Sequence, residues 1–163
     1  YIFDVRFAVS FFMYLWNNAF IIALGQTCIA GAVGVWFFTP NGQKGKVRSV
    51  TQAVFICFRY HTGSLAFGAF VLATVQFIRW FLMYLEQQSK AQKNKVMQCI
   101  LKALQYALWC LEKFIKFLNK NAYIQIALRG KNFCESARKA WEIITKNIIR
   151  FGVVATLGRV IHY

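Results

Sequence analysis

The chain has 163 residues, of which 58% are hydrophobic and 18% aromatic, and its 20 Lys and Arg against five Asp and Glu give a net charge of +15. A soluble globular domain is nearer half apolar, so water is not the only solvent that this composition suits. So basic a chain would suggest nucleic acid as a partner. Because the charges are absent from two long stretches, we expect a lipid bilayer and no nucleic acid as the partner.

The first hydrophobic stretch has no charged side chain from Phe7 to Gln43. A helix of about 20 apolar residues crosses a hydrocarbon core of ~30 Å, so this stretch predicts one membrane span over about 7–38. It ends in the aromatic sequence WFF and the turn sequence TPNG, which are typical of a membrane edge and a loop. Small residues at three- and four-residue spacing would let another helix approach closely, and we expect packing positions at Gly25, Gly31 and Gly34.

A second uncharged stretch runs from Tyr60 to Ile78 and has an arginine immediately on each side. It predicts a second span over about 54–84, because arginine at the end of a span can extend its charged group to the interface. Two further packing positions are expected within it, at Gly63 and Gly68.

The sequence changes character after residue 85. Residues 86–150 contain 13 Lys or Arg and four Glu, with apolar residues at helical spacing, which is typical of amphipathic helices. A third span over 104–128 is the alternative, but Glu112, Lys113 and Lys116 would lie near its centre, at about 2.5–3.5 kcal/mol for each charge. We therefore favour a helix at the membrane interface, with Glu112 and Lys116 paired at i,i+4.

A last amphipathic helix is predicted from Asn132, which would cap its start, with Glu135 at the third helical position. Its apolar stripe consists of Phe133, Ala137, Ala140, Trp141, Ile144, Ile148 and Phe151. The chain is thus divided into a transmembrane region, 1–85, and an amphipathic region, 86–163. The basic excess of 86–150 over the connector at 39–59 places the amphipathic region on the cytoplasmic side.

Four stretches of the sequence resemble consecutive signatures of the choline transporter-like family of solute carriers: IIALGQTCIAGAVG, FRYHTGSLAFGAFVLATVQFIR, LWCLEKFIKFLNKNAYIQIAL and GKNFCESARKAWEIITKNIIR. They lie in the family's order over about residues 17–156. The resemblance implies that this chain is a late-middle piece of a longer protein with about ten spans. The fold class is therefore all-α integral membrane, with about two transmembrane helices and basic amphipathic interfacial helices in a larger helical bundle.

The resemblance also implies facilitated transport of choline or a related organic cation without a covalent reaction. We expect no cofactor and no bound metal. The remaining transmembrane helices of the same protein or of a complex are the implied partners. The implied location is a multi-pass position in the plasma membrane, with organellar membranes, including mitochondrial ones, as the alternative. The alternative function is a structural or accessory membrane subunit that does not transport.

Candidate substrate-path residues are aromatic or polar side chains in or beside the spans, because a quaternary ammonium is recognised by aromatic faces and buried polar groups face protein or water. They are Trp16, Gln26, Thr27, Trp36, Tyr60, His61, Gln76 and Trp80. For each, helix packing or an interfacial hydrogen bond is the competing interpretation.

The sequence contains no nucleophile motif, phosphate-binding loop or dinucleotide fingerprint, and we expect no enzyme activity. Five cysteines are scattered without metal-ligand spacing. Cys99 and Cys110 are candidate lipidation sites, with an unmodified thiol as the alternative. Several family members have a denser cysteine cluster there, and this chain departs from that pattern.

Overall fold

A computed structural model of the chain describes residues 4–44, 47–91 and 95–161. Its elements are α1 (Val5–Phe38), the 3₁₀ turn η1 (Asn41–Gln43), α2 (Ser49–Ile56), the π-helical turn η2 (Cys57–His61), α3 (Thr62–Ala91), α4 (Lys95–Arg129), α5 (Phe133–Lys146) and α6 (Ile148–Ile161). All regular structure in these ranges is helical. Two helices, Val5–Phe38 and the continuous Ser49–Lys90, are long and apolar enough to cross a membrane, which confirms the predicted fold class.

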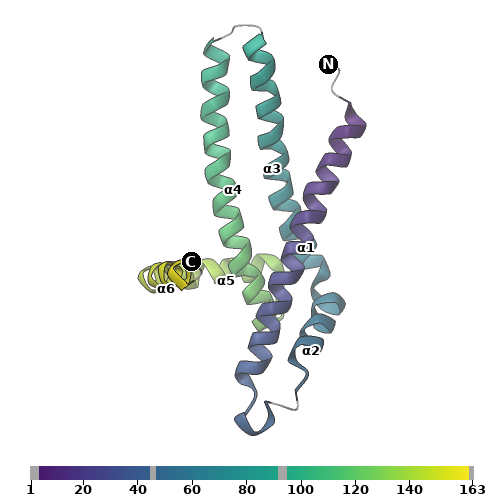
Figure 1. Ribbon diagram of the computed structural model, residues 1–163, viewed down its shortest axis with the longest axis vertical. Helices are drawn as coiled ribbons and strands as arrows, with labels where there is room; N and C mark the ends of the chain where they lie inside the picture. Colours follow the sequence, from purple (N-terminus) through teal and green to yellow (C-terminus); the bar gives the residue numbers. More distant parts are fainter. Residues whose placement is uncertain (1–3, 45–46, 92–94, 162–163) are drawn as a thin grey trace.

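The long helices run side by side and alternate in direction (Figure 1). α1 descends to the connector at the lower end, α2 and α3 return upward, and α4 descends again beside α3. α5 crosses the lower part of α4, and α6 continues to one side, away from the long helices. The lower end of α1 and the upper ends of α3 and α4 are therefore at opposite ends of the molecule, and α4 runs back until Leu128 lies beside Gly34 of α1. The side of the membrane on which each end lies stays a prediction.

The second span contains an irregularity that its hydropathy does not predict. Residues Cys57–His61 form a π-helical turn between α2 and α3. Thr62 Oγ1 donates to the carbonyl of Phe58 at 2.8 Å, so its hydroxyl bonds a carbonyl within the turn. Single π turns inside α-helices are often found near functional sites, and this one includes His61.

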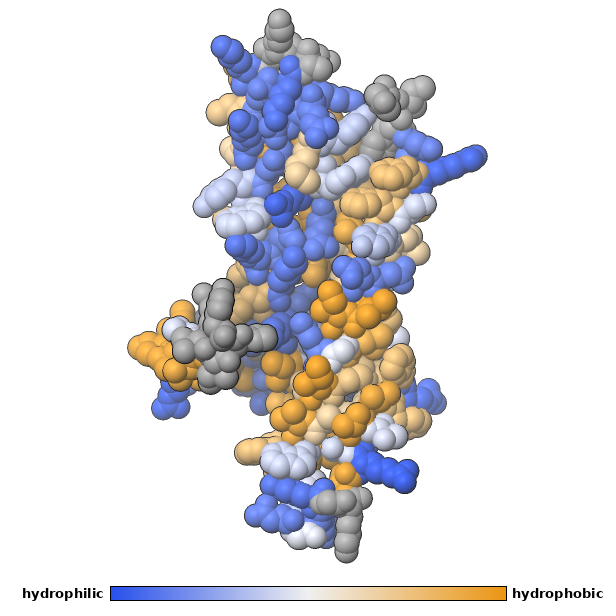
Figure 2. Space-filling view, viewed as in Figure 1, coloured by the Kyte–Doolittle hydropathy of each residue, from blue (hydrophilic) through white to orange (hydrophobic). Residues whose placement is uncertain are grey.

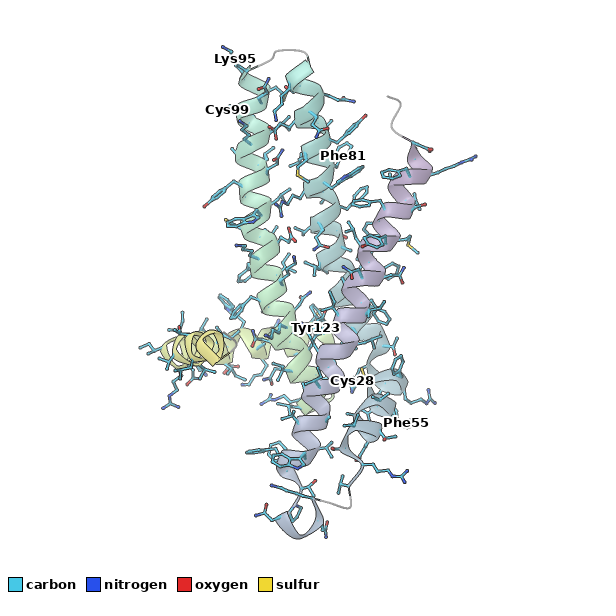
Figure 3. The ribbon with its side chains drawn as sticks, viewed as in Figure 1. Cys28, Phe55, Phe81, Lys95, Cys99 and Tyr123 are labelled. Carbon is cyan, nitrogen blue, oxygen red and sulfur yellow. The ribbon has the colours of Figure 1, made fainter. Side chains whose placement is uncertain are left out.

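The core lies where α1, α3 and α4 meet. Its buried residues are Ala23, Cys57, Leu65, Tyr123 and Ile126. Figure 3 shows Tyr123 at the place where α4 comes beside α1. Because side chains such as Ala23 are small, three helix backbones can approach one another closely at this level.

The five glycines expected at packing positions have two kinds of environment. A Cβ at Gly31 would lie 3.2 Å from that of Ala53, a Cβ at Gly34 2.8 Å from the Leu128 side chain, and a Cβ at Gly68 2.5 Å from the Phe133 ring. No atom lies within 4 Å of a Cβ built at Gly25 or Gly63. In the described structure, close helix approach thus occurs at three of the five positions.

α4 is a single helix of 35 residues that packs along α3 and along the lower half of α1. The sequence favours an interfacial position for 104–128, and the lipid environment of this helix stays a prediction. The expected pair is present, with Lys116 Nζ 2.7 Å from Glu112 Oε1. Glu112 is only 6% exposed, so its charge is removed from water and needs compensation.

α5 begins as the sequence predicts and ends earlier. Asn132 Oδ1 accepts a hydrogen bond from the backbone N–H of Glu135 at 2.9 Å, which confirms the predicted cap. The predicted single stripe through Ile148 is wrong, because the helix breaks at Asn147 and Ile148 is 66% exposed. The side chain of Phe151, also placed in the stripe, lies outside the described part.

Replacing Asn132 with alanine is expected to destabilise the start of α5 by about 1 kcal/mol, since the cap satisfies one of the free N–H groups of the first turn. Amide hydrogen exchange of α5 in the full-length protein measures this effect. The variant Asn132→Ser retains a capping oxygen and serves as the control. Equal exchange in both variants would contradict a capping role.

The surface divides into an apolar and a polar part. Figure 2 shows hydrophobic residues gathered in a band below the middle of the bundle and over α6, with hydrophilic residues above the band on the α3–α4 hairpin and below it at the lower end. The exposed residues of α6 include Ile149 and Val154, which are 80% and 67% exposed. An apolar surface of this kind is covered by lipid or by other helices of a membrane protein.

Candidate functional site

A cavity of about 350 Å³ lies between α1, α3 and α4 and is lined by Ala19, Ile22, Gln26, Leu72, Lys116, Phe117, Asn119, Lys120 and Tyr123. Its size falls in the ordinary range of small-molecule sites. Gln26 is the predicted path residue among these, and α4 supplies most of the polar lining. The cavity therefore depends on α4, none of whose residues is among the predicted substrate-path residues.

Glu112 is the centre of a cluster of charged and polar groups beside the cavity. Its carboxylate accepts hydrogen bonds from Gln76 Nε2 at 3.0 Å and from Arg79 Nη1 at 2.7 Å. Lys116, which also lines the cavity, is the third partner, at 2.7 Å. The cluster joins α3 to α4, and it brings the predicted residue Gln76 into a structural contact.

The charges around the cavity do not favour the binding of a cation by these residues alone. Lys116 and Lys120 line it, and the residues that line it include no carboxylate. The nearby Glu112 is already bonded to two cations. An organic cation in this space would rely on the aromatic rings of Phe117 and Tyr123 and would meet two positive charges.

Two lining residues of α4 are fixed by contacts with α3. Asn119 Nδ2 donates to the carbonyl of Gly68 at 2.8 Å and is buried. Tyr123 is 4% exposed, and its hydroxyl lies beside Gly68. This wall of the cavity is therefore held in place by buried contacts.

The sequence pattern predicts the Glu112–Lys116 pair of α4 but assigns no residue of 104–128 to the substrate path, because its charges favour an interfacial helix. Glu112, Lys116, Asn119 and Tyr123 follow one another at spacings of four, three and four residues. Such spacing places them on one face of a helix. This polar face is the signal that could have found them.

Two other predicted residues, Thr27 and His61, line a separate small space of about 40 Å³ together with Gly31 and Cys57. Thr27 is buried, and its hydroxyl donates to the carbonyl of Ala23 at 2.8 Å. The structure thus brings these two candidates together, away from the lining of the larger cavity.

The predicted tryptophans have different surroundings. Trp16 donates from Nε1 to the carbonyl of Ala66 at 3.0 Å and so joins α1 to α3. Trp80 packs in a row of rings, with its centroid 4.9 Å from that of Phe11. Both contacts belong to the packing of α1 against α3.

Trp36 and Tyr60 lie on the surface, 52% and 69% exposed. Lys44 Nζ is 4.4 Å from the centre of the Trp36 ring, and Arg59 lies 5.8 Å from that of Tyr60. The eight candidates therefore do not converge on one site in the described residues.

The two cysteines with a predicted lipidation role, Cys99 and Cys110, are free and exposed on α4. Figure 3 shows Cys99 near the upper end of α4, close to Lys95. Lipidation of either thiol stays a prediction.

A sequence model described as plasma-membrane choline transporter matches residues 3–163, nearly the whole chain. The chain belongs to this family. It is 48% identical over 144 residues to choline transporter-like protein 2 of Homo sapiens, and 42% identical over 144 residues to the protein of the same name from Dictyostelium discoideum. These alignments cover 88% of the chain in both cases.

The chain spans about a fifth of the length of these choline transporter-like relatives, 20% of the human protein and 23% of the Dictyostelium protein. The family is one of membrane transporters, which confirms the resemblance seen in the sequence. The cavity between α1, α3 and α4 is accordingly part of the structure of a choline transporter-like protein.

Proposed function

We propose that this chain forms part of a carrier for choline or a related organic cation, and that α1, α3 and α4 form one wall of the transport path. Membership of the plasma-membrane choline transporter family carries this proposal. The cavity between the three helices supports it, because polar side chains such as Gln26 and Asn119 in its mostly apolar lining are retained at membrane level where they face a path or a partner. The activity would be transport without a covalent reaction.

The lining of the cavity suggests a path and not the main ammonium site. Two lysines oppose a cation there, while Phe117 and Tyr123 offer aromatic faces. We infer that other helices of the full-length protein supply the remaining aromatic groups and the counter-charge. Alternating access would then open and close this wall against the rest of the bundle.

The proposed location is the plasma membrane, as the description of the family indicates. Surface labelling of the full-length protein in intact cells checks this location. Labelling found only after the cells are made permeable would instead place the protein in an organelle.

Uptake of radiolabelled choline into liposomes that contain the full-length protein tests the transport proposal. Saturable uptake above that of empty vesicles is the expected result. If correctly folded protein from several preparations gives no such uptake, the choline assignment fails and the accessory-subunit alternative is favoured.

Gln26→Leu is expected to lower the rate of choline uptake by roughly threefold to tenfold, the range that corresponds to one lost hydrogen bond. Gln26 lines the cavity, and leucine would remove its polar group from the path. Gln98→Leu is the matched control, because Gln98 is half-buried on α4 and does not line the cavity. Equal uptake by both variants would remove Gln26 from the path.

A further inference from the structure

A second pocket, of about 130 Å³, lies at the corner between α4 and α5 and is lined by Arg129, Lys131, Glu135, Ser136, Arg138, Lys139 and Glu142. Four of these side chains are cationic and two are anionic. The space corresponds to roughly four water molecules at ~30 Å³ each, which suits a small polar group. None of these residues lines the cavity between α1, α3 and α4.

The turn between the two helices creates this corner. Gly130 has φ of +66°, a left-handed conformation that favours glycine and ends helices. Its N–H donates to the carbonyl of Ile126 at 2.8 Å. The reversal of the chain brings Arg129 and Lys131 beside the first turns of α5.

The carboxylates of the pocket already have cationic partners. Glu142 lies 2.8 Å from Lys139 and 2.7 Å from Lys146, and hydrogen bonds from these two lysines lower its pKa to about 2. Glu135 lies 3.6 Å from Lys131. Arg129 and Arg138, in contrast, have no carboxylate partner among residues 4–44, 47–91 and 95–161. Two guanidinium groups are therefore available to an anion.

An unpartnered buried hydroxyl gives independent evidence for a ligand. Ser136 is 1% exposed, and its Oγ lacks a hydrogen-bond partner in the described structure. A buried polar group without a partner costs free energy and calls for an explanation. Because Ser136 lines the pocket, an oxygen-rich anion there would accept its hydrogen bond.

We propose that this pocket binds the phosphate group of an anionic lipid, with Arg129 and Arg138 holding the phosphate oxygens and Ser136 donating to one of them. Arginine forms paired hydrogen bonds with phosphate, and these are among the strongest in proteins.

The surroundings of the pocket favour a lipid over free phosphate as the source. α6 follows α5 directly and has exposed aliphatic side chains, such as Ile149 and Val154, which acyl chains would cover.

Native mass spectrometry of the full-length protein in detergent tests the proposal, with phosphatidic acid as the probe and diacylglycerol of the same chains as the control lipid. The two lipids differ only in the phosphate group. We expect phosphatidic acid to bind and diacylglycerol not to bind. Equal binding of both lipids would overturn the proposal, and inorganic phosphate that binds alone and displaces the lipid would overturn the assignment to a lipid.

Variants locate the site. Arg129→Gln/Arg138→Gln is expected to lower the affinity for phosphatidic acid about tenfold or more, and Ser136→Ala to lower it severalfold. Lys95→Gln/Lys102→Gln is the matched control, because it removes two exposed charges at the far end of α4. The same loss in this control, or no loss in the arginine variant, would overturn the assignment. Lipid binding is measured without transport, so the outcome is independent of choline uptake.

Discussion

Replacing Glu112 with glutamine is expected to lower the free energy of unfolding by about 2 kcal/mol. The substitution leaves Arg79 and Lys116 without their counter-charge beside a buried position. Removal of one partner of a fully buried ion pair costs about 3–5 kcal/mol. We expect less here, because the side chains of Arg79 and Lys116 are 33% and 52% exposed. The midpoint of thermal unfolding of the full-length protein in detergent measures the change.

Glu142→Gln is the matched control for this prediction. Glu142 also contacts two lysines, but its side chain is 41% exposed and water can solvate its partners. We expect the unfolding midpoint of this variant to stay close to that of the native protein. The double variant Arg79→Gln/Glu112→Gln should recover part of the stability that Glu112→Gln loses. A loss of unfolding free energy in the double variant that is larger than the summed losses of the two single variants would argue against direct pairing.

Replacing Gly68 with alanine is expected to lower the free energy of unfolding by about 1–3 kcal/mol, as forced overpacking of a core does. The new methyl group would lie 2.5 Å from the Phe133 ring and 2.7 Å from the Tyr123 hydroxyl. These are side chains of α5 and α4, so both helices would have to move away from α3. The same unfolding measurement detects this effect.

Gly63→Ala on the same helix is the control, because the change in the free energy of unfolding should differ in sign between the two variants. No atom lies within 4 Å of a Cβ at Gly63, so alanine should be neutral or stabilising by about 0.5–1 kcal/mol through its better helix propensity. Phe133→Leu in the Gly68→Ala background should recover stability, because it removes the ring that the methyl group meets. Equal effects of alanine at both glycines would contradict the close approach of α5 at Gly68.

Helix positions could be predicted because they depend on local pattern. The absence of charge from 7–43 defines α1, and Asn132 with Glu135 defines the start of α5. The end of α5 could not be predicted, since apolar spacing continues through Ile148 while the helix breaks at Asn147. The π-helical turn at Cys57–His61 likewise could not be predicted from the hydropathy pattern.

The candidate site was predicted only in part. Gln26 was identified as a polar interruption of an apolar span, and it lines the cavity. The opposite wall, with Asn119 and Lys120, comes from a helix whose charges opposed burial in the sequence interpretation. Those charges are tolerated because Arg79 and Gln76 of α3 reach Glu112 of α4, a pairing across 33 and 36 residues that no local pattern reveals.

By itself the sequence determined that two helices are long and apolar enough for a bilayer, that the later helices are basic and amphipathic, and that the chain resembles a transporter family. Hydropathy and charge are properties of single residues and their spacing, so they can be determined from the sequence without knowledge of the tertiary structure. Only the tertiary structure decided that α4 packs against both α1 and α3, that the Phe133 ring occupies the space beside Gly68, and that Ser136 lies buried at a pocket whose two arginines have no carboxylate partner among the described residues. Those features depend on which residues distant in sequence meet, and that is fixed by packing of whole helices.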